Sequence, residues 1–108
     1  MRVSAAELGP GVVLGERATL VQFSTAFCQP CRATRRVLAG AAALVPGVVH
    51  VEVDAEQRLE LVRRLEVAST PTTLVLDAAG SVVKRAAGQP RRAEVLAALA
   101  VAVAPPGT

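Results

Sequence analysis

Two cysteines separated by two residues are the feature that most restricts what this chain can become. Cys28 and Cys31 are its only cysteines, and they stand between an apolar run, Thr19 to Phe23, and a helix-like stretch. Two sulfurs at this spacing can form an intramolecular disulfide when the first turn of a helix brings them together. The pattern is typical of a dithiol–disulfide redox site.

The position of the pair at the start of a helix assigns different roles to the two sulfurs. Unpaired N–H groups and the positive end of the helix dipole stabilise a thiolate at the N-terminus, so we expect Cys28 to be the nucleophile. Cys31, one turn further along, is then the resolving thiol. Pro30 has a fixed φ that suits a first helical turn. Gln29 and Pro30 are the two intervening residues that tune the redox behaviour.

Two other interpretations of the cysteine pair stay open. A zinc site needs four ligands, or three in a catalytic site, and the chain offers one further good ligand, His50, far away in sequence. A purely structural disulfide would close so short a ring that it would constrain the unfolded chain very little. The redox interpretation is therefore favoured, and no metal or organic cofactor is expected.

The length and composition indicate one globular domain over residues 1–108. The chain has 108 residues, of which 52% are hydrophobic and two are aromatic. This length supports one core but not two. No apolar run is long enough to span a membrane, and no signal peptide opens the chain. A leader or anchor removed before Met1 would be invisible in the sequence.

The charge is basic and carried almost entirely by arginine. The net charge is +3, and arginines follow the cysteine motif at Arg32, Arg35 and Arg36. With so few aromatic residues between them, they do not indicate a nucleic-acid surface. They are read either as solvated helix faces or as a preference for acidic partners. Two cysteines are too few for a disulfide scaffold, which predicts a reducing, cytoplasmic location.

The first half of the chain alternates strands and helices. Ser4 and Glu7 form a capping-box pattern, which predicts a short helix, and a short strand is expected over Val12 to Leu14. The run Thr19 to Phe23 predicts a buried strand. A helix is expected from Cys28 to Leu44, with an inward face formed by Ala33, Val37, Ala41 and Leu44.

The second half continues the alternation and then turns back. A second buried strand is predicted over Val48 to Val53. Asp54 is expected to cap a helix that reaches about Leu65. Strands over Thr73 to Leu76 and Val82 to Ala86, joined by a tight turn at 77–80, predict an antiparallel hairpin. Gly88, Gln89 and Pro90 lead into a last helix, whose apolar residues are Val95, Leu96, Leu99 and Val103.

This order of elements predicts an α/β fold. Two strands joined through a helix should be parallel, and the hairpin strands antiparallel, which gives a mixed central sheet with helices on both faces.

The sequence resembles the thioredoxin family from about Thr19 to Val103. The matching features are a buried strand, the Cys28-Gln29-Pro30-Cys31 motif opening a helix, the Val-Glu-Val-Asp54 strand, Thr70-Pro71 before a hairpin, and Gly80 and Gly88. A Cys-x-x-Cys motif alone is a weak signal. Followed about 40 residues later by Thr-Pro at the start of a hairpin, it is a strong one.

The resemblance implies roles for residues around the motif. In the family the proline that matches Pro71 is cis and faces the disulfide, and the backbone at Thr70 is free to pair with an extended substrate. Ala87 and Gly88 would form another wall of the substrate contact surface. Phe27 replaces the usual tryptophan as an apolar lid, and Gln29 adds a hydrogen-bonding side chain beside the nucleophile.

The sequence departs from the family pattern beneath the motif and at the N-terminus. The family buries an aspartate where this chain has Gln22, and an amide cannot take the proton of Cys31. His50 has two alternative roles: it accepts that proton in place of the acid, or it is a partly buried histidine bonded to Gln22 or to the backbone. The N-terminal layer is expected to be shortened relative to the family.

Together these features predict a monomeric thiol–disulfide oxidoreductase that reduces disulfides in target proteins. A separate reductase would then restore the dithiol. One rival hypothesis is an oxidase or isomerase outside the cytosol, and another is a partner-binding module with weak redox activity.

Overall fold

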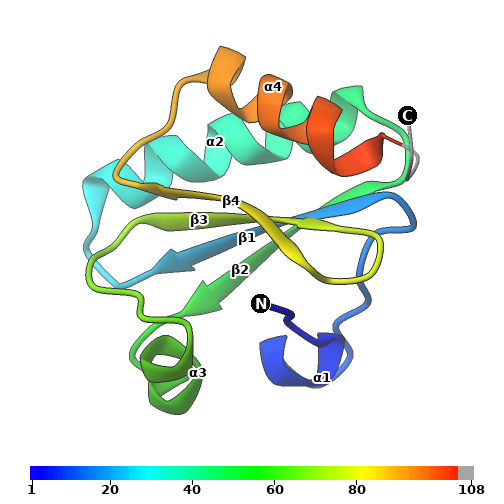
Figure 1. Cartoon of the computed structure of the whole chain (residues 1–108). Coiled ribbons are helices and arrows are strands. Elements are labelled where there is room, and N and C mark those ends of the chain that lie inside the picture. The colour runs from blue at the N-terminus through cyan, green and yellow to red at the C-terminus, as the bar shows by residue number, and fades with distance from the viewer. Residues whose placement is uncertain (105–108) are drawn as a thin grey trace.

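Four strands form one mixed sheet in the computed structural model, which describes residues 1–104 (Figure 1). The elements in chain order are α1 (Ala5–Leu8), β1 (Ala18–Ser24), α2 (Gln29–Leu44), β2 (Val48–Asp54), α3 (Leu59–Arg64), β3 (Thr72–Asp77), β4 (Val82–Ala87) and α4 (Arg92–Val103). The sequence also predicts a tail over Ala104 to Gly107, of which the part from residue 105 onward lies outside the described residues.

The strand order is β2-β1-β3-β4, with β1 and β2 parallel and the other two pairs antiparallel. The predicted mixed sheet and hairpin are therefore confirmed. The hairpin turn is closed by Gly80, whose amide donates to the Asp77 carbonyl at 3.0 Å and whose φ is +85°. A side chain at Gly80 would also collide with the Val3 backbone, which explains why glycine stands there.

Helices cover both faces of the sheet, as predicted. Figure 1 shows α2 and α4 on one face and α1 and α3 on the other. Alternate strand residues supply the two cores because side chains of a strand point to opposite faces in turn. One core contains Leu20, Leu38 and Leu99, and the other contains Val21, Phe23 and Leu74.

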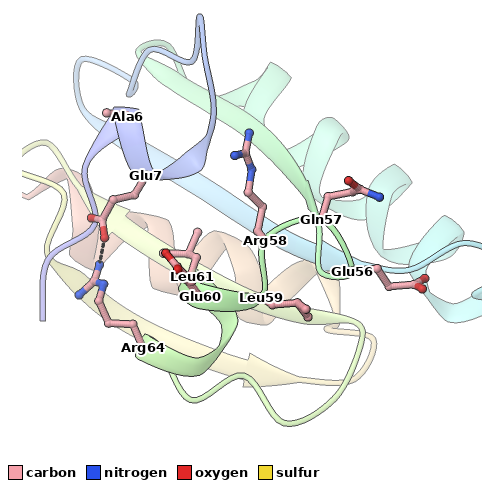
Figure 2. Close-up of a pocket in the computed structure, with 9 residues that line it drawn as sticks. All are labelled: Ala6, Glu7, Glu56, Gln57, Arg58, Leu59, Glu60, Leu61 and Arg64. Carbon is pink, nitrogen blue, oxygen red and sulfur yellow. Dashed lines mark ion pairs between the residues drawn. The ribbon is translucent and has the colours of Figure 1, made fainter.

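The N-terminal layer is short. Ser4 caps α1 with the predicted capping box, but this helix has only four residues. Before it, Arg2 makes one isolated bridge to Ser81. Figure 2 shows the ion pair that ties α1 to α3, in which Arg64 lies 2.7 Å from the Glu7 carboxylate. Hydrogen bonding to Ser4, helped by Arg64, lowers the pKa of Glu7.

Several predicted local features are wrong. Residues 12–14 form no strand, since they run along the chain without a pairing partner in the sheet. Asp54 does not cap α3: its side chain accepts a hydrogen bond from the Glu56 amide, and the helix begins only at Leu59. The strand β2 is not fully buried, because it lies at the edge of the sheet.

The inward face of α2 is also displaced from the prediction. The buried residues are Cys31, Thr34, Leu38 and Ala41, whereas Leu44 is 55% exposed. Of the four residues predicted to face inward, only Ala41 is fully buried, and Ala33 and Val37 are half-buried.

Four loops meet at one end of the sheet, where three strands end and one begins. The register places the ends of β1, β2 and β4 beside the start of β3, so these strands are continued at that end by four loops: 25–28, 55–58, 69–71 and 88–90. The N-terminus of α2 starts there too, on the left of Figure 1. The predicted redox residues gather at this end of the sheet. Within residues 1–104, no helix has both the length and the apolar character required to cross a membrane.

Candidate redox site

Cys28 and Cys31 are joined by a disulfide at the N-terminus of α2, with their Cα atoms 5.2 Å apart. Cys28 is the N-cap residue, and its sulfur accepts a hydrogen bond from the Cys31 amide at 3.2 Å. Pro30 lies in the first turn, where its missing N–H leaves no helical bond unmade. The Thr34 hydroxyl donates to the Pro30 carbonyl at 2.8 Å and fastens the same turn.

The two sulfur-bearing residues differ in exposure. Cys28 is half-buried, whereas Cys31 is only 1% exposed. An incoming molecule therefore reaches Cys28 and not Cys31. This asymmetry arises because Cys28 precedes the helix while Cys31 faces the sheet from its first turn.

Phe27, immediately before the disulfide, is exposed and has an unusual backbone. The residue is 98% exposed and its φ is +61°, a left-handed conformation that is uncommon for a bulky residue. An apolar ring held in water by a strained backbone is a feature often found at functional sites.

Beneath α2, the face of the sheet becomes polar. Gln22 is fully buried in β1, and its amide nitrogen donates to the Cys31 carbonyl at 2.8 Å and to the Ser24 hydroxyl at 2.9 Å. Its amide oxygen lies 3.0 Å from Nε2 of His50. Because an amide oxygen can only accept a hydrogen bond, Nε2 of His50 is the donor and carries the proton.

His50 is therefore placed as the second of its two predicted roles requires, hydrogen-bonded to Gln22. Burial lowers the pKa of His50; the Glu52 carboxylate works against this shift, and Arg35 adds to it. Arg35 makes two hydrogen bonds of 2.7 Å to Glu52. This hydrogen bonding lowers the pKa of Glu52 and raises that of Arg35.

The loop before β3 lies against the other loops at the same end of the sheet. The Thr70–Pro71 peptide bond is cis, as the resemblance implied. The Gly88 amide donates to the Pro71 carbonyl at 2.8 Å, and the hydroxyls of Thr70 and Thr25 are 3.3 Å apart. These contacts bring Thr70 and Pro71 together with Gly88, Ala87 and the loop that precedes the cysteines.

Three polar residues of the site were not predicted from the sequence. Ser24 is a partner of Gln22, Thr25 is the partner of Thr70, and Thr34 fastens the first turn of α2. Threonine and serine are common in loops and strands. The sequence carried no signal that distinguished these three from the others.

Comparison with known proteins agrees with this geometry. The family model for thioredoxin matches residues 5–101. Thioredoxin H5 of Oryza sativa subsp. japonica is 32% identical over 60 residues. That alignment covers 56% of this chain and 44% of the rice protein, so it spans less than half of the relative's length.

Solved thioredoxins share the fold. A point mutant of the thioredoxin from Halobacterium salinarum NRC-1 superposes with a TM-score of 0.75 at 17% identity, covering 83% of this chain and 78% of that one. Thioredoxin f from spinach chloroplast (short form) gives 0.70 at 24% identity, covering 82% and 78%. At these identities the likeness concerns the fold alone. With the family model matching nearly the whole chain, this protein belongs to the thioredoxin family.

Proposed function

We propose that the chain is a thiol–disulfide oxidoreductase that reduces disulfides in target proteins. The observation that carries the proposal is the unequal exposure of Cys28 and Cys31 at the N-terminus of α2. One sulfur is open to attack a target and the other is held back. A separate reductase would restore the dithiol in a reducing, cytoplasmic setting, and the chain would act as a monomer.

The reaction begins with the Cys28 thiolate, which the helix N-terminus stabilises. Its sulfur attacks one sulfur of the target disulfide and displaces the other as a thiolate, which takes up a proton. The product is a mixed disulfide between Cys28 and the target. Cys31 then loses its proton and attacks the Cys28 sulfur, which releases the second target thiol. The target gains two electrons and two protons, and the chain is left as the Cys28–Cys31 disulfide.

Gln22 and His50 are positioning residues in this proposal. The Gln22 amide holds the Cys31 carbonyl, and His50 holds the Gln22 oxygen. Because an amide does not titrate, the hydrogen bond from Gln22 to the Cys31 carbonyl is not lost through a change in the charge of Gln22. The alternative role for His50, acceptance of the Cys31 proton, predicts a changed pH–rate profile in His50→Gln.

The substrate would lie across the loops at this end of the sheet. Phe27 offers an apolar face, and Gln29 lies at the first position of α2. Within residues 1–104, the Thr70 amide and carbonyl make no backbone hydrogen bond, which leaves them free for an extended segment of the target. Pro71 would face the disulfide, and Ala87 and Gly88 would border the segment on its other side.

The cysteine variants test the assignment of roles. Cys28→Ser should abolish reduction of a protein disulfide, whereas Cys31→Ser should trap the mixed disulfide, detected as an added mass on a non-reducing gel and by mass spectrometry. The matched control for each variant is the other one. Full activity of Cys28→Ser would exclude the proposed nucleophile.

The reduction potential tests the direction of electron flow. Equilibration in defined thiol–disulfide buffers, followed by alkylation and mass detection, suits a chain without tryptophan or tyrosine. A value near about −270 mV supports a reductase, and one near about −120 to −180 mV supports an oxidase or isomerase. A stable complex formed by the double Cys→Ser variant, with negligible turnover by the wild type, would instead indicate a partner-binding module.

A further inference from the structure

A groove of about 550 Å³ opens directly beside the disulfide. Its lining residues come from the first two turns of α2 and from the loop before α4: Gln29, Pro30, Arg32, Ala33, Arg36 and Gln89. Gln29 and Pro30 are the two residues between the cysteines. A target whose disulfide reaches the Cys28 sulfur therefore lies next to this groove.

The groove is basic and its charges are not compensated. Arg32 and Arg36 are one turn apart on α2 and both are exposed. Within residues 1–104 neither makes an ion pair or a side-chain hydrogen bond, and no acidic residue lines the groove. Arg35, on the same helix, is by contrast held by the Glu52 carboxylate of β2. Of the three arginines of α2, Arg32 and Arg36 are therefore the two available to a partner at this groove.

A second groove, between α1 and α3, shows that this arrangement is not general. It is lined by Glu7, Glu56 and Glu60 as well as by Arg58 and Arg64, and one arginine is paired with Glu7 (Figure 2). Its opposite charges compensate one another, so it provides no reason for a charged ligand to bind.

The position of Arg32 is unfavourable for the helix itself. Cations near the N-terminus of a helix are opposed by its dipole, and acidic residues are preferred there. The first turn of α2 contains no acidic residue, and Arg32 follows it directly. Helix stability therefore does not explain the charge at Arg32. Arg32 and Arg36, one turn apart, suit a carboxylate ligand, because a guanidinium pairs with a carboxylate through two parallel hydrogen bonds.

We propose that this groove makes the protein prefer target disulfides that are flanked by acidic residues of a polypeptide. Arg32 and Arg36 would pair with aspartate or glutamate of the target, and the amides of Gln29 and Gln89 would donate further hydrogen bonds. The inference rests on the proposed function, because it names the class of target that the same redox site reduces.

The test uses three synthetic peptides that contain the same intramolecular disulfide. Their flanking residues are glutamate, glutamine or lysine, so that the first two have nearly the same shape. The chain is reduced beforehand, freed of reductant and mixed with each peptide in a single turnover, which is quenched by alkylation and followed by mass. We expect the glutamate peptide to react about tenfold faster than the lysine peptide at low salt, since electrostatic steering changes association rates by such factors. The ratio should shrink in high salt.

Matched charge variants separate the groove from the net charge. Arg32→Gln with Arg36→Gln removes two charges from the groove, and glutamine keeps a similar helix propensity. Arg2→Gln with Arg17→Gln removes two charges at the opposite end of the sheet. Arg2 lies beside Ser81, and Arg17 directly precedes β1. The groove variant should bring the glutamate-to-lysine rate ratio close to one, and the control variant should retain most of it.

The outcomes distinguish this inference from the proposed function. Equal rates for the three peptides, or an equal loss of preference in both double variants, would overturn the acidic-target inference and leave the oxidoreductase intact. Failure to reduce even the glutamine peptide would overturn the oxidoreductase and this inference with it. The rate ratio is the decisive readout because removing arginines near Cys28 also changes thiolate reactivity toward every substrate.

Discussion

At the scale of single residues, Gln22 is the most informative side chain of the site. It is fully buried, and its amide makes three hydrogen bonds, to Ser24, to the Cys31 carbonyl and to His50. An ionised carboxylate at this position could not make the same bonds, because it has no N–H to donate to the Cys31 carbonyl. The amide thus fixes the redox turn without adding a charge beneath it.

The histidine bonded to Gln22 should make folding depend on pH. Burial lowers the pKa of His50 in the folded chain below its ordinary value of 6.5. The unfolded chain therefore binds the proton more readily, and the free energy of unfolding should fall as the pH drops from 6.5 through the lower folded pKa. In His50→Gln this part of the pH dependence should disappear.

The measurement is urea denaturation of both proteins followed by far-UV circular dichroism at a series of pH values. The pKa of Glu52 is also lowered from its ordinary value of 4.5, so protonation of Glu52 lowers the free energy of unfolding only below about that pH. The effects of His50 and Glu52 therefore fall in different pH ranges. Identical pH dependence of the two proteins above pH 5 would contradict the assignment. The same pair of proteins gives the pH–rate profile that tests proton acceptance by His50.

The site was predictable where its chemistry is written in the sequence itself. The cysteine pair, Pro30 and the Thr70–Pro71 step occupy fixed places along the chain, and the resemblance gave Gln22 and His50 their positions. The hydrogen bonds of Thr25, Ser24 and Thr34 depend on which loops and strands meet in three dimensions. Such contacts follow from tertiary packing and leave no local pattern.

At the scale of elements, α2 shows how a correct helix can be given the wrong face. Its limits were predicted to within one residue, yet alanine is so frequent in it that several faces look equally apolar. Counting from Ala33 placed Leu44 inside and left Leu38 out. In the structure Leu38 is fully buried and Leu44 is 55% exposed. Both residues are leucines, so side-chain size does not decide between them. The face that packs on the sheet is the one that contains Cys31, and it continues through Thr34, Leu38 and Ala41.

This difference gives a matched pair of substitutions. Leu38→Ala should lower the free energy of unfolding by about 2–5 kcal/mol, because it leaves a cavity beside Leu20 and Leu99. Leu44→Ala, the same change further along the same helix, should alter it by about 0.5 kcal/mol or less. Urea denaturation followed by circular dichroism measures both. Equal losses in the two variants would contradict the observed face of α2.

The strands of the sheet were predicted within one residue at each end, and the predictions that failed are those that depend on tertiary structure. The sequence of β2 reads as a buried strand, but its position at the edge of the sheet leaves it partly exposed, and strand order is not a local property. Residues 12–14 are apolar because Val12 and Leu14 pack against the core beneath the sheet, not because they pair as a strand. Asp54 forms a local turn instead of a cap, since the N-cap position of α3 is taken by Arg58.

At the scale of the whole molecule, two hydrophobic cores share one sheet. Adjacent residues of β1 supply both, Leu20 to the core beneath α2 and α4, and Val21 to the core beneath α1 and α3. Neither helical layer can keep its core if the sheet separates. We therefore propose that residues 1–108 behave as a single domain and unfold in one cooperative transition.

Methyl signals in nuclear magnetic resonance test this cooperativity, since the chain lacks the usual fluorescent residues. Leu99 reports on one core and Leu61 on the other, on opposite faces of the sheet. Both signals should be lost at the same urea concentration, together with the circular dichroism of the backbone, as expected for a two-state domain of this size. Earlier loss of the Leu61 signal would mean that α3 and its short partner α1 detach before the sheet opens. The redox site, whose loops connect the sheet to helices of both layers, would then lose its structure in steps, before global unfolding.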